Sequence, residues 1–503
     1  MRFMWAALIV SAFFYGVFYT FLPLTLLPIL VLPLCALAGF VIWALPATKE
    51  GPSRSLTGMF FAFFIALILW PNYLAISIPG LPWITVLRLV GIPMTLVLLV
   101  SLSRSPQLRN EIKEVLAGSP WIWKLLVTFV FIQAATLPLS GRPFTSLSRF
   151  MIAQINWTMI FFASCYVFRK RQRVFQWSLM LVIMALIVIA IGALEWRRHH
   201  VLWAGHLPAF LAVSDDVVQK ILAGGTRFGV QYRTQSTFTT ALSFAEYLAL
   251  TTPFVIHVAV EGRRQATRLA AMVCVPVIFF GVFISGSRLG ALGFFLSFLL
   301  YIAAWGWRRW RSDRSSIFGP AIILGYPAIF GAVVGASLVN LRLYRMIWGG
   351  GQYTYSTDAR RVQLEMGIPK ILHAPWGYGI GEAGQALQYY NPGGTLTVDN
   401  YWLTIALSYG IPGLIAYFGM FAAAIYYAAR VLSRSTSYEV TYLLPAAIAL
   451  ANFVVIKTVF SQEANHPLAF MLLGLVAVLV WRASKEEQPP LPMRPIPPQG
   501  ISL

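Results

Sequence analysis

The chain has 503 residues, of which 58% are hydrophobic and only 11% charged, and this leaves too little polar surface for a soluble protein of this length. The 38 Lys and Arg against 17 Asp and Glu give a formal charge of +21, and anionic membrane lipids account for part of it. Because the basic residues are divided among many short loops, nucleic acid is not an expected partner. The composition predicts an all-α polytopic membrane protein.

Apolar windows of about 20 residues, the length of a helix that crosses a bilayer, predict about fourteen spans. They lie near residues 4–20, 22–45, 57–77, 84–102, 121–139, 150–168, 175–194, 237–260, 269–285, 288–306, 317–338, 401–429, 441–460 and 467–482. The first two are expected to form a retained hairpin, because the apolar run after Met1 has no convincing signal-peptide cleavage site.

Short basic loops alternate with the other loops along the chain. Under the positive-inside rule the basic loops and both termini are cytoplasmic. These loops are Lys49–Arg54, Arg104–Lys113, Arg169–Arg173, Arg263–Arg268, Arg308–Arg314 and Arg430–Arg434. The loops expected on the outer face are Pro79–Thr85, Gly141–Arg149, Glu195–Ser236, Gly286–Ser287, Asn340–Asn400 and Ser461–His466.

Two of the outer loops are long enough to contain helices of their own. In the second, the apolar pattern from Ala359 to Leu372 suits an amphipathic helix at the membrane surface, and the glycine-rich segment Pro375–Gly384 is expected to end it. Four regions follow from this pattern. They are 1–230 (N-terminal spans and first outer loop), 231–430 (core with the 340–400 loop), 431–485 (C-terminal hairpin) and 486–503 (Pro-rich cytoplasmic tail).

Arginines in outward loops indicate an anionic ligand. Arg288, in SGSRLGAL, must lie at the outer interface between two spans, where a guanidinium needs an anionic partner unless it snorkels or pairs with a neighbouring helix. Arg227 and Arg233 lie shortly before the eighth span and would add positive charge at the same cavity mouth. Arg360 and Arg361 would form a phosphate clamp, although a solvated helix face explains them almost as well.

Asp399 and Asn400 lie where the second long outer loop re-enters the membrane. Asp399 is either the N-cap of the next helix or a general base that faces the arginines. The His and Cys residues show no metal-ligand spacing, and the sequence has no nucleotide-binding fingerprint, so neither a metal nor another cofactor is expected.

In this order, the motifs resemble the O-antigen ligase and Wzy-type polysaccharide polymerase superfamily of bacterial inner membranes, over roughly residues 230–430. The resemblance rests on Arg233, SGSRLGAL, DARR, APWGYGIG and DNYWLTIALSYGIPGL. It implies a GT-C-like, metal-independent, inverting glycosyltransferase with a periplasmic active site. The implied substrate is an undecaprenyl-diphosphate-linked oligosaccharide, with chain-length regulators and export proteins as further partners.

The resemblance also implies roles for individual residues. Arg233 and Arg288 match the arginines that bind the diphosphate, and Asp399 occupies the position where ligases commonly have a His as the base. Ser236 is a second departure, because family members often have Gly there. Aromatic residues of the second loop would stack on sugars or anchor the loop at the interface; they are Trp348, Tyr353, Tyr355, Trp376, Tyr378, Tyr389 and Tyr390.

Three functions stay open from the sequence. The Asp at position 399 favours a polymerase of lipid-linked repeat units over a ligase that transfers a finished glycan to lipid A core or another acceptor. A lipid-linked oligosaccharide flippase is the alternative from another class. It would need cationic residues deep within the spans and short loops, whereas the arginines of this chain lie on one side, next to long loops.

Overall fold

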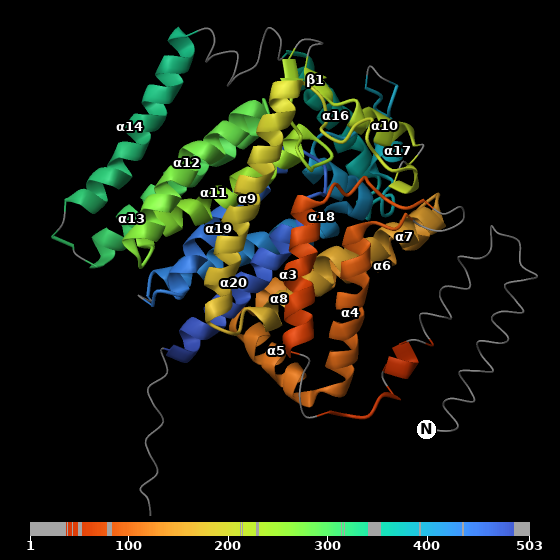
Figure 1. The fold of residues 1–503 in the computed structure, drawn as a ribbon, viewed down its shortest axis with the longest axis horizontal. Helices are drawn as coiled ribbons and strands as arrows, with labels where there is room; N and C mark the ends of the chain where they lie inside the picture. Colours follow the sequence, from red (N-terminus) through yellow and green to blue (C-terminus); the bar gives the residue numbers. More distant parts are fainter. Residues whose placement is uncertain are drawn as a thin grey trace, which may run out of the picture.

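The computed structural model describes residues 37–486, apart from residues 38, 43, 49–52, 78–82, 212, 214, 228–230, 313, 316, 341–353, 392–393 and 435–436. The described chain is almost entirely helical (Figure 1), with one antiparallel hairpin of two short strands, β1 (Gly225–Arg227) and β2 (Gln231–Arg233). The predicted span 4–20, most of the predicted span 22–45 and nearly all of the predicted tail lie outside the described residues.

The chain is a multi-pass membrane protein. Nine helical stretches among the described residues are long and apolar enough to cross a bilayer. These are α4 (Val86–Arg104), α6 (Pro120–Ala135) with η2 (Leu137–Leu139), α7 (Pro143–Ala153) with η3 (Gln154–Thr158) and α8 (Met159–Val167), α9 (Gln172–Arg198), α11 (Ala241–Glu261), α12 (Gln265–Ile284), α13 (Arg288–Ser312), α18 (Tyr401–Leu432) and α20 (His466–Glu486).

Three further apolar helices occupy predicted spans. They are α3 (Ser53–Leu69), α14 (Phe318–Val339) and α19 (Leu443–Ile456), the last preceded by η6 (Val440–Tyr442). Every predicted span after the first two therefore has a helix at its position. Helices α11 and α20 are almost wholly buried, whereas only 28% of the residues in the apolar windows of α4, α6 and α12 are buried, as in lipid-facing helices. Helix α11 packs on α9, α12, α13 and α19 at the centre of the protein.

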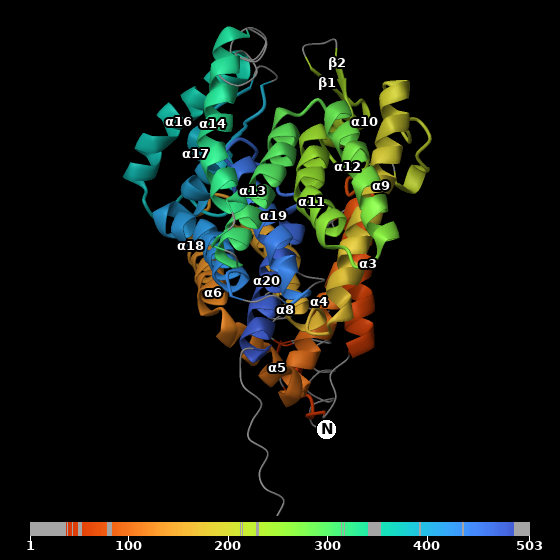
Figure 2. The same ribbon diagram turned by 90° about the vertical axis from the view of Figure 1, so that its left-hand side faces the viewer.

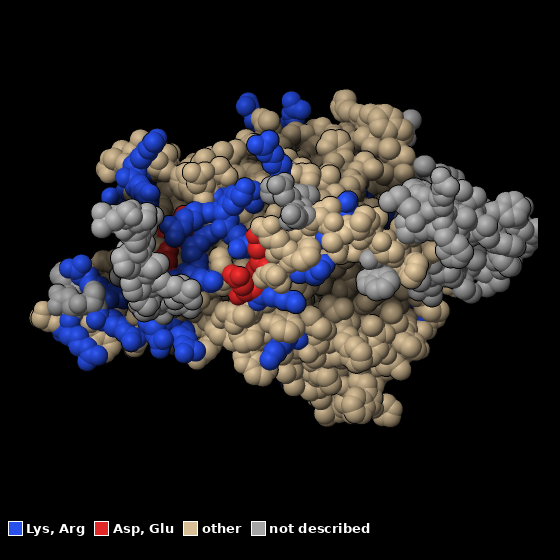
Figure 3. Space-filling model, turned by 90° about the horizontal axis from the view of Figure 1, so that it is seen from below, with Lys and Arg blue, Asp and Glu red and all other residues tan. Residues whose placement is uncertain are grey.

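The connecting segments gather at two opposite ends of the helices. Figures 1 and 2 show α10 (Asp216–Leu222), the β-hairpin, α16 (Thr354–His373) and α17 (Ala383–Leu387) at one end and α5 (Pro106–Gly118) at the other. The first group belongs to the loops predicted to face outward, and α5 to a loop predicted to be cytoplasmic. Figure 3 looks onto the α5 end, where Lys and Arg side chains gather. We call the opposite end the loop end.

Helix α16 confirms the predicted helix at 359–372 and ends where the glycine-rich segment begins. The face of α16 that packs against α18 matches the predicted apolar stripe only in part. Ala359 and Gln363 are buried, and a Cβ added at Gly367 would lie 2.5 Å from Leu403 Cδ1 of α18. Four of the predicted apolar side chains are exposed instead; they are Val362, Leu364, Ile368 and Leu372. Small side chains allow the close approach to α18, and Met366 and Ile371 pack beside them against the cluster that includes Leu403, so only part of the apolar stripe packs against the protein.

Helix α18 is kinked at Gly410, which has a φ of +69°. Pro412 has no N–H, so the carbonyl of Ser408 lacks its usual helical donor, and Gly379 N donates to it at 3.0 Å. Tyr378 N donates to the Leu407 carbonyl at 2.8 Å, and Ile411 N donates to the Pro375 carbonyl at 2.9 Å. The turn after α16 therefore satisfies the backbone groups that the kink leaves open.

Glycine is required on both sides of this contact. Gly377, Gly379 and Gly381 have φ values of +89°, +103° and +78°, a region that side-chain-bearing residues rarely adopt. A Cβ added at Gly377 would lie 2.5 Å from the Ser408 carbonyl oxygen, and one added at Gly410 would lie 2.0 Å from that of Pro375. The contact fixes residues 375–381 against α18, and we call it the glycine contact.

We predict that Gly410→Ala destabilises the protein by about 2–4 kcal/mol, because it adds left-handed backbone strain to a steric clash. The measurement is the midpoint of heat-induced loss of monodisperse protein in detergent. Gly325→Ala in α14 is the matched control, since an added Cβ there would have no atom within 4 Å. Equal midpoints for the two variants would show that the glycine contact is not required.

Candidate functional site

Two of the predicted arginines flank one turn. Strand β2 ends at Arg233, whose Nε donates to the Ser285 carbonyl at 3.2 Å, and Thr234 N donates to the Ile284 carbonyl at 3.3 Å. The chain then turns at Gly286 and Ser287, and α13 begins at Arg288. Arg233 and Arg288 are both half-buried, and both lie beside the α12–α13 turn at the loop end.

A buried carboxylate fixes the chain after Arg233. Glu195, near the end of α9, accepts hydrogen bonds from Tyr232 Oη at 2.8 Å, Gln235 N at 3.1 Å and Ser236 N at 2.7 Å. Ser236 has a φ of +54°, which explains why glycine suits this position. The Ser236 hydroxyl donates to the Val188 carbonyl at 2.7 Å, a contact that glycine could not make.

Arg360 and Asp399 join this region. Burial lowers the pKa of Arg360, the negative charge of Asp399 opposes that effect, and the positive charge of Arg288 adds to it. The three side chains therefore interact electrostatically, although they come from α16, the segment before α18, and the start of α13. We call Arg233, Arg288, Arg360 and Asp399 the arginine cluster.

Two buried donors in this region lack hydrogen-bond partners among the described residues. They are Arg360 Nε and Gln363 Nε2. The Gln363 side chain also accepts a hydrogen bond from Asp399 N at 2.9 Å through Oε1. Buried donors are normally paired, so an anionic or hydroxyl-bearing ligand beside Asp399 would complete the set.

Asp399 and Asn400 have different local contacts. The N-cap of α18 is Asn400, whose Oδ1 accepts from Trp402 N at 2.9 Å and Leu403 N at 3.3 Å. The carboxylate of Asp399 instead accepts from the Thr397 hydroxyl at 3.2 Å. Of the two interpretations of Asp399, the helix cap is therefore wrong. The role of general base stays a prediction.

The other predicted site residues have contacts of their own. Arg361 is exposed and pairs with Glu365 at 2.9 Å, on a solvated helix face. The Tyr378 hydroxyl donates to the Lys370 carbonyl at 3.1 Å. Arg227 ends β1, but its side chain lies outside the described part, as do those of Trp348, Tyr353 and Tyr355. Trp376 and Tyr390 are exposed.

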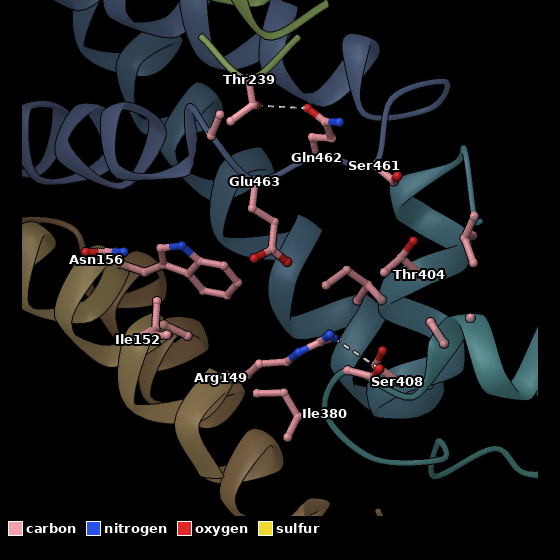
Figure 4. A pocket seen from close by; sticks show the side chains of 18 of the residues that line it. Arg149, Ile152, Asn156, Thr239, Ile380, Thr404, Ser408, Ser461, Gln462 and Glu463 are labelled. Carbon is pink, nitrogen blue, oxygen red and sulfur yellow. Dashed lines mark hydrogen bonds between the residues drawn. The ribbon is translucent and has the colours of Figure 1, made fainter. Parts of the chain in front are cut away.

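A cavity of about 780 Å³ lies between helices of the protein, and its lining includes Val398, a chain neighbour of Asp399, but none of the four residues of the arginine cluster. Its wall comes from α7, residues 237–239, residues 380–385, α18 and the α19–α20 connection. The polar lining includes Arg142, Arg149, Asn156, Gln462 and Glu463. Figure 4 shows the side chains of Arg149 and Glu463 directed into the cavity from opposite sides.

Sequence reasoning did not select these cavity residues. Arg142 and Arg149 belong to the predicted outer loop Gly141–Arg149, and Glu463 belongs to Ser461–His466. Acidic residues are scarce in this chain, so a carboxylate in an outer loop was a usable signal.

The charged groups of the cavity are held in place by the surrounding structure. Arg149 Nη1 donates to the Gly381 carbonyl at 3.1 Å, and Arg142 forms an ion pair with Glu382 at 3.1 Å. Glu382 also accepts from the Ser140 hydroxyl at 2.9 Å. Burial acts to raise the pKa of Glu382, but these hydrogen bonds outweigh it and lower the pKa below the usual range. Glu382 is therefore ionised at neutral pH.

Glu463 is held from behind by a tyrosine. The Tyr401 hydroxyl donates to Glu463 Oε1 at 3.0 Å. Desolvation of the carboxylate by the surrounding protein raises the pKa of Glu463. The hydrogen bond from Tyr401 and the positive charges of Lys457 and Arg149 oppose this effect. Deeper in the protein, Lys457 and Glu246 form a fully buried ion pair at 2.8 Å, and Asn465 donates to Glu246 at 2.9 Å. The two charges of this buried pair neutralise one another, so the pair adds no net charge behind the cavity wall.

In the described part of the chain, no group of three or more His, Cys, Asp or Glu residues could hold a metal ion. Comparison with curated proteins finds no match. Residues 270–418 match the protein family Wzy_C, described as O-Antigen ligase. The matched segment includes Arg288, Arg360 and Asp399, whereas Arg233, Arg149 and Glu463 lie outside it. Residues 270–418 are therefore a domain of the O-antigen ligase family, whose members carry out glycan transfer of the ligase or polymerase type.

Proposed function

We propose that the chain is an inverting, metal-independent glycosyltransferase of the bacterial inner membrane that polymerises undecaprenyl-diphosphate-linked repeat units of a surface polysaccharide or exopolysaccharide. In this proposal the termini are cytoplasmic and the loop end is periplasmic. The observation that carries it is the meeting of Arg288, Arg360 and Asp399 in the matched domain, with Arg233 beside the same turn.

The arginines would stabilise the leaving group. When the bond between the anomeric carbon and the diphosphate oxygen breaks, negative charge develops on the lipid diphosphate. Guanidinium groups bind such oxygens with strong, charge-assisted hydrogen bonds. Half-buried groups that are already oriented stabilise developing charge better than solvated ones. Arg360 Nε, a buried donor with no hydrogen-bond partner in the described part of the chain, supports this role.

Asp399 would activate the acceptor. Its carboxylate takes the proton of an acceptor hydroxyl while that oxygen bonds to the anomeric carbon from the face opposite the diphosphate. The products are the extended glycan, with an inverted anomeric centre, and the lipid diphosphate. The carboxylate is suited to this step because the helix cap is made by Asn400 and not by Asp399.

A ligase is the second candidate, and the family description, O-Antigen ligase, favours it. In that case the chain would move a finished glycan to lipid A core or another acceptor. The Asp at position 399, where ligases commonly have a His, favours the polymerase.

Deletion of the gene, followed by analysis of cellular glycans, separates the two candidates. For a polymerase we expect single repeat units to remain on the lipid carrier. Long polymer that is not attached to its acceptor would identify a ligase. An unchanged glycan profile would contradict both.

We predict that Arg288→Ala lowers activity by about 10²- to 10³-fold, the usual effect of removing one group that stabilises developing charge, with unchanged expression. Complementation of the deletion strain and immunoblotting of membranes provide the measurement. Arg430→Ala is the control, since Arg430 is exposed near the far end of α18. Normal glycan production by Arg288→Ala would rule out the diphosphate-binding role.

We predict that Asp399→Asn slows transfer by about 10²- to 10⁴-fold, because the amide keeps the shape but cannot accept the proton. The measurement is the rate of product formation at saturating substrate with purified enzyme. Its thermal stability should stay near that of the unsubstituted protein, since Asn400 keeps the α18 cap. A rate within a few-fold of the unsubstituted enzyme would exclude Asp399 as the base.

A further inference from the structure

We propose that the cavity between Arg149 and Glu463 is the subsite for the acceptor glycan, which it binds through sugar hydroxyl groups rather than through a diphosphate. This inference rests on the proposed glycosyl transfer and extends it to residues outside the matched domain. We call the cavity the acceptor subsite.

The charge of the cavity suits a hydroxyl-rich ligand. Two arginines line it, Arg142 and Arg149, and each has a carboxylate nearby: Glu382 forms the ion pair with Arg142, and Glu463 interacts electrostatically with Arg149. The formal charges of these four groups cancel. A diphosphate in this space would meet the Glu463 carboxylate, and one of the two guanidinium groups is already paired with Glu382, whereas sugar hydroxyls can donate to the carboxylate and accept from the guanidinium groups.

Arg149 and Glu463 do not form an ion pair within 4.0 Å; the described ion pairs are formed by other residues. In Figure 4 the Glu463 carboxylate points down into the cavity, and the Arg149 side chain extends below it toward Ser408. The inner oxygen of Glu463, Oε1, is bonded to Tyr401, while Oε2 has no hydrogen-bond partner among the described residues. A bridging ligand would thus find a preoriented donor on one wall and a preoriented acceptor on the other.

The rest of the wall has the mixed character that sugar rings require. Apolar surface comes from residues such as Ile152, Phe238 and Ile405, and uncharged polar groups come from Asn156, Thr404, Ser408, Ser461 and Gln462. The volume of about 780 Å³ lies within the range of about 300–1,000 Å³ typical of small-molecule pockets. This is room for the end of an oligosaccharide and not for a complete lipid-linked substrate.

The position of the acceptor subsite also fits the reaction. Its wall includes Val398 and Thr404, on either side of Asp399 and Asn400 in the chain. An acceptor held here would therefore lie next to the carboxylate proposed to take its proton. The arginine cluster would hold the diphosphate of the donor on the other side of Asp399.

Protection of an engineered cysteine tests this binding without turnover. Ser461→Cys places a thiol on the cavity wall, and its rate of reaction with a maleimide is measured in the full-length protein in detergent. Labelling of the parent chain, which includes Cys165 and Cys274, is subtracted. The probes are oligosaccharides released by mild acid from the surface polysaccharide of cells that carry the gene, and inorganic pyrophosphate.

We expect the oligosaccharides to slow labelling of Ser461→Cys and pyrophosphate to leave it unchanged. With Glu463→Gln added, the half-protecting concentration should rise about ten- to a hundredfold, the effect of losing a charged hydrogen-bond partner. An unchanged rate without ligand shows that this variant keeps its fold. Glu114→Gln is the matched control, because its ion pair with Lys485 is half-exposed at the α5 end.

Two results would overturn the acceptor subsite. Protection by pyrophosphate instead of the oligosaccharides would make the cavity a diphosphate site, and protection by neither would remove a ligand from it. If deletion of the gene changes the cellular glycans in either of these cases, the glycosyltransferase proposal stands and only the subsite fails. An unchanged glycan profile, in contrast, refutes the transferase itself.

Discussion

The glycine contact is the constraint on which the loop end depends. A bilayer offers no hydrogen-bond partners, so a break in a membrane helix persists only where protein groups satisfy the freed backbone. The kink of α18 meets this condition because the turn at residues 375–381 donates to the Leu407 and Ser408 carbonyls. That turn also carries Gly381, which accepts from Arg149. One backbone contact therefore fixes the start of α18, the end of α16 and part of the cavity wall.

Charge is distributed unevenly between the two neighbouring regions of the loop end. In the arginine cluster Arg288 and Arg360 accompany the carboxylate of Asp399, and Arg233 lies beside the same turn as Arg288. The buried donors Arg360 Nε and Gln363 Nε2 have no hydrogen-bond partner among the described residues. At the cavity, each of the two lining arginines has a carboxylate nearby, Glu382 for Arg142 and Glu463 for Arg149. A glycosyltransferase needs both environments at once, because one substrate carries the leaving diphosphate and the other presents hydroxyl groups. The segment of residues 398–404 borders both.

The sequence predicted the helices well because a span needs only length and apolar character, and both can be read locally. It also gave Arg288 and Asp399 as candidate site residues, because both lie in recognisable motifs, and their roles stay predictions. It could not identify the cavity, because Arg149 and Glu463 are 314 positions apart in the numbering and meet only through the packing of α7, α18 and the α19–α20 connection. The contact face of α16 was hidden for a similar reason. It depends on Gly367 fitting against Leu403, a property of the pair rather than of either helix.

Asp399 and Asn400, the two residues before α18, differ in their contacts with the helix: Asn400 caps it, and Asp399 does not. Because Asn400 supplies both capping hydrogen bonds, a change in the protonation of Asp399 breaks no bond to the helix. The first turn of α18 is therefore capped independently of the contacts that the Asp399 carboxylate makes.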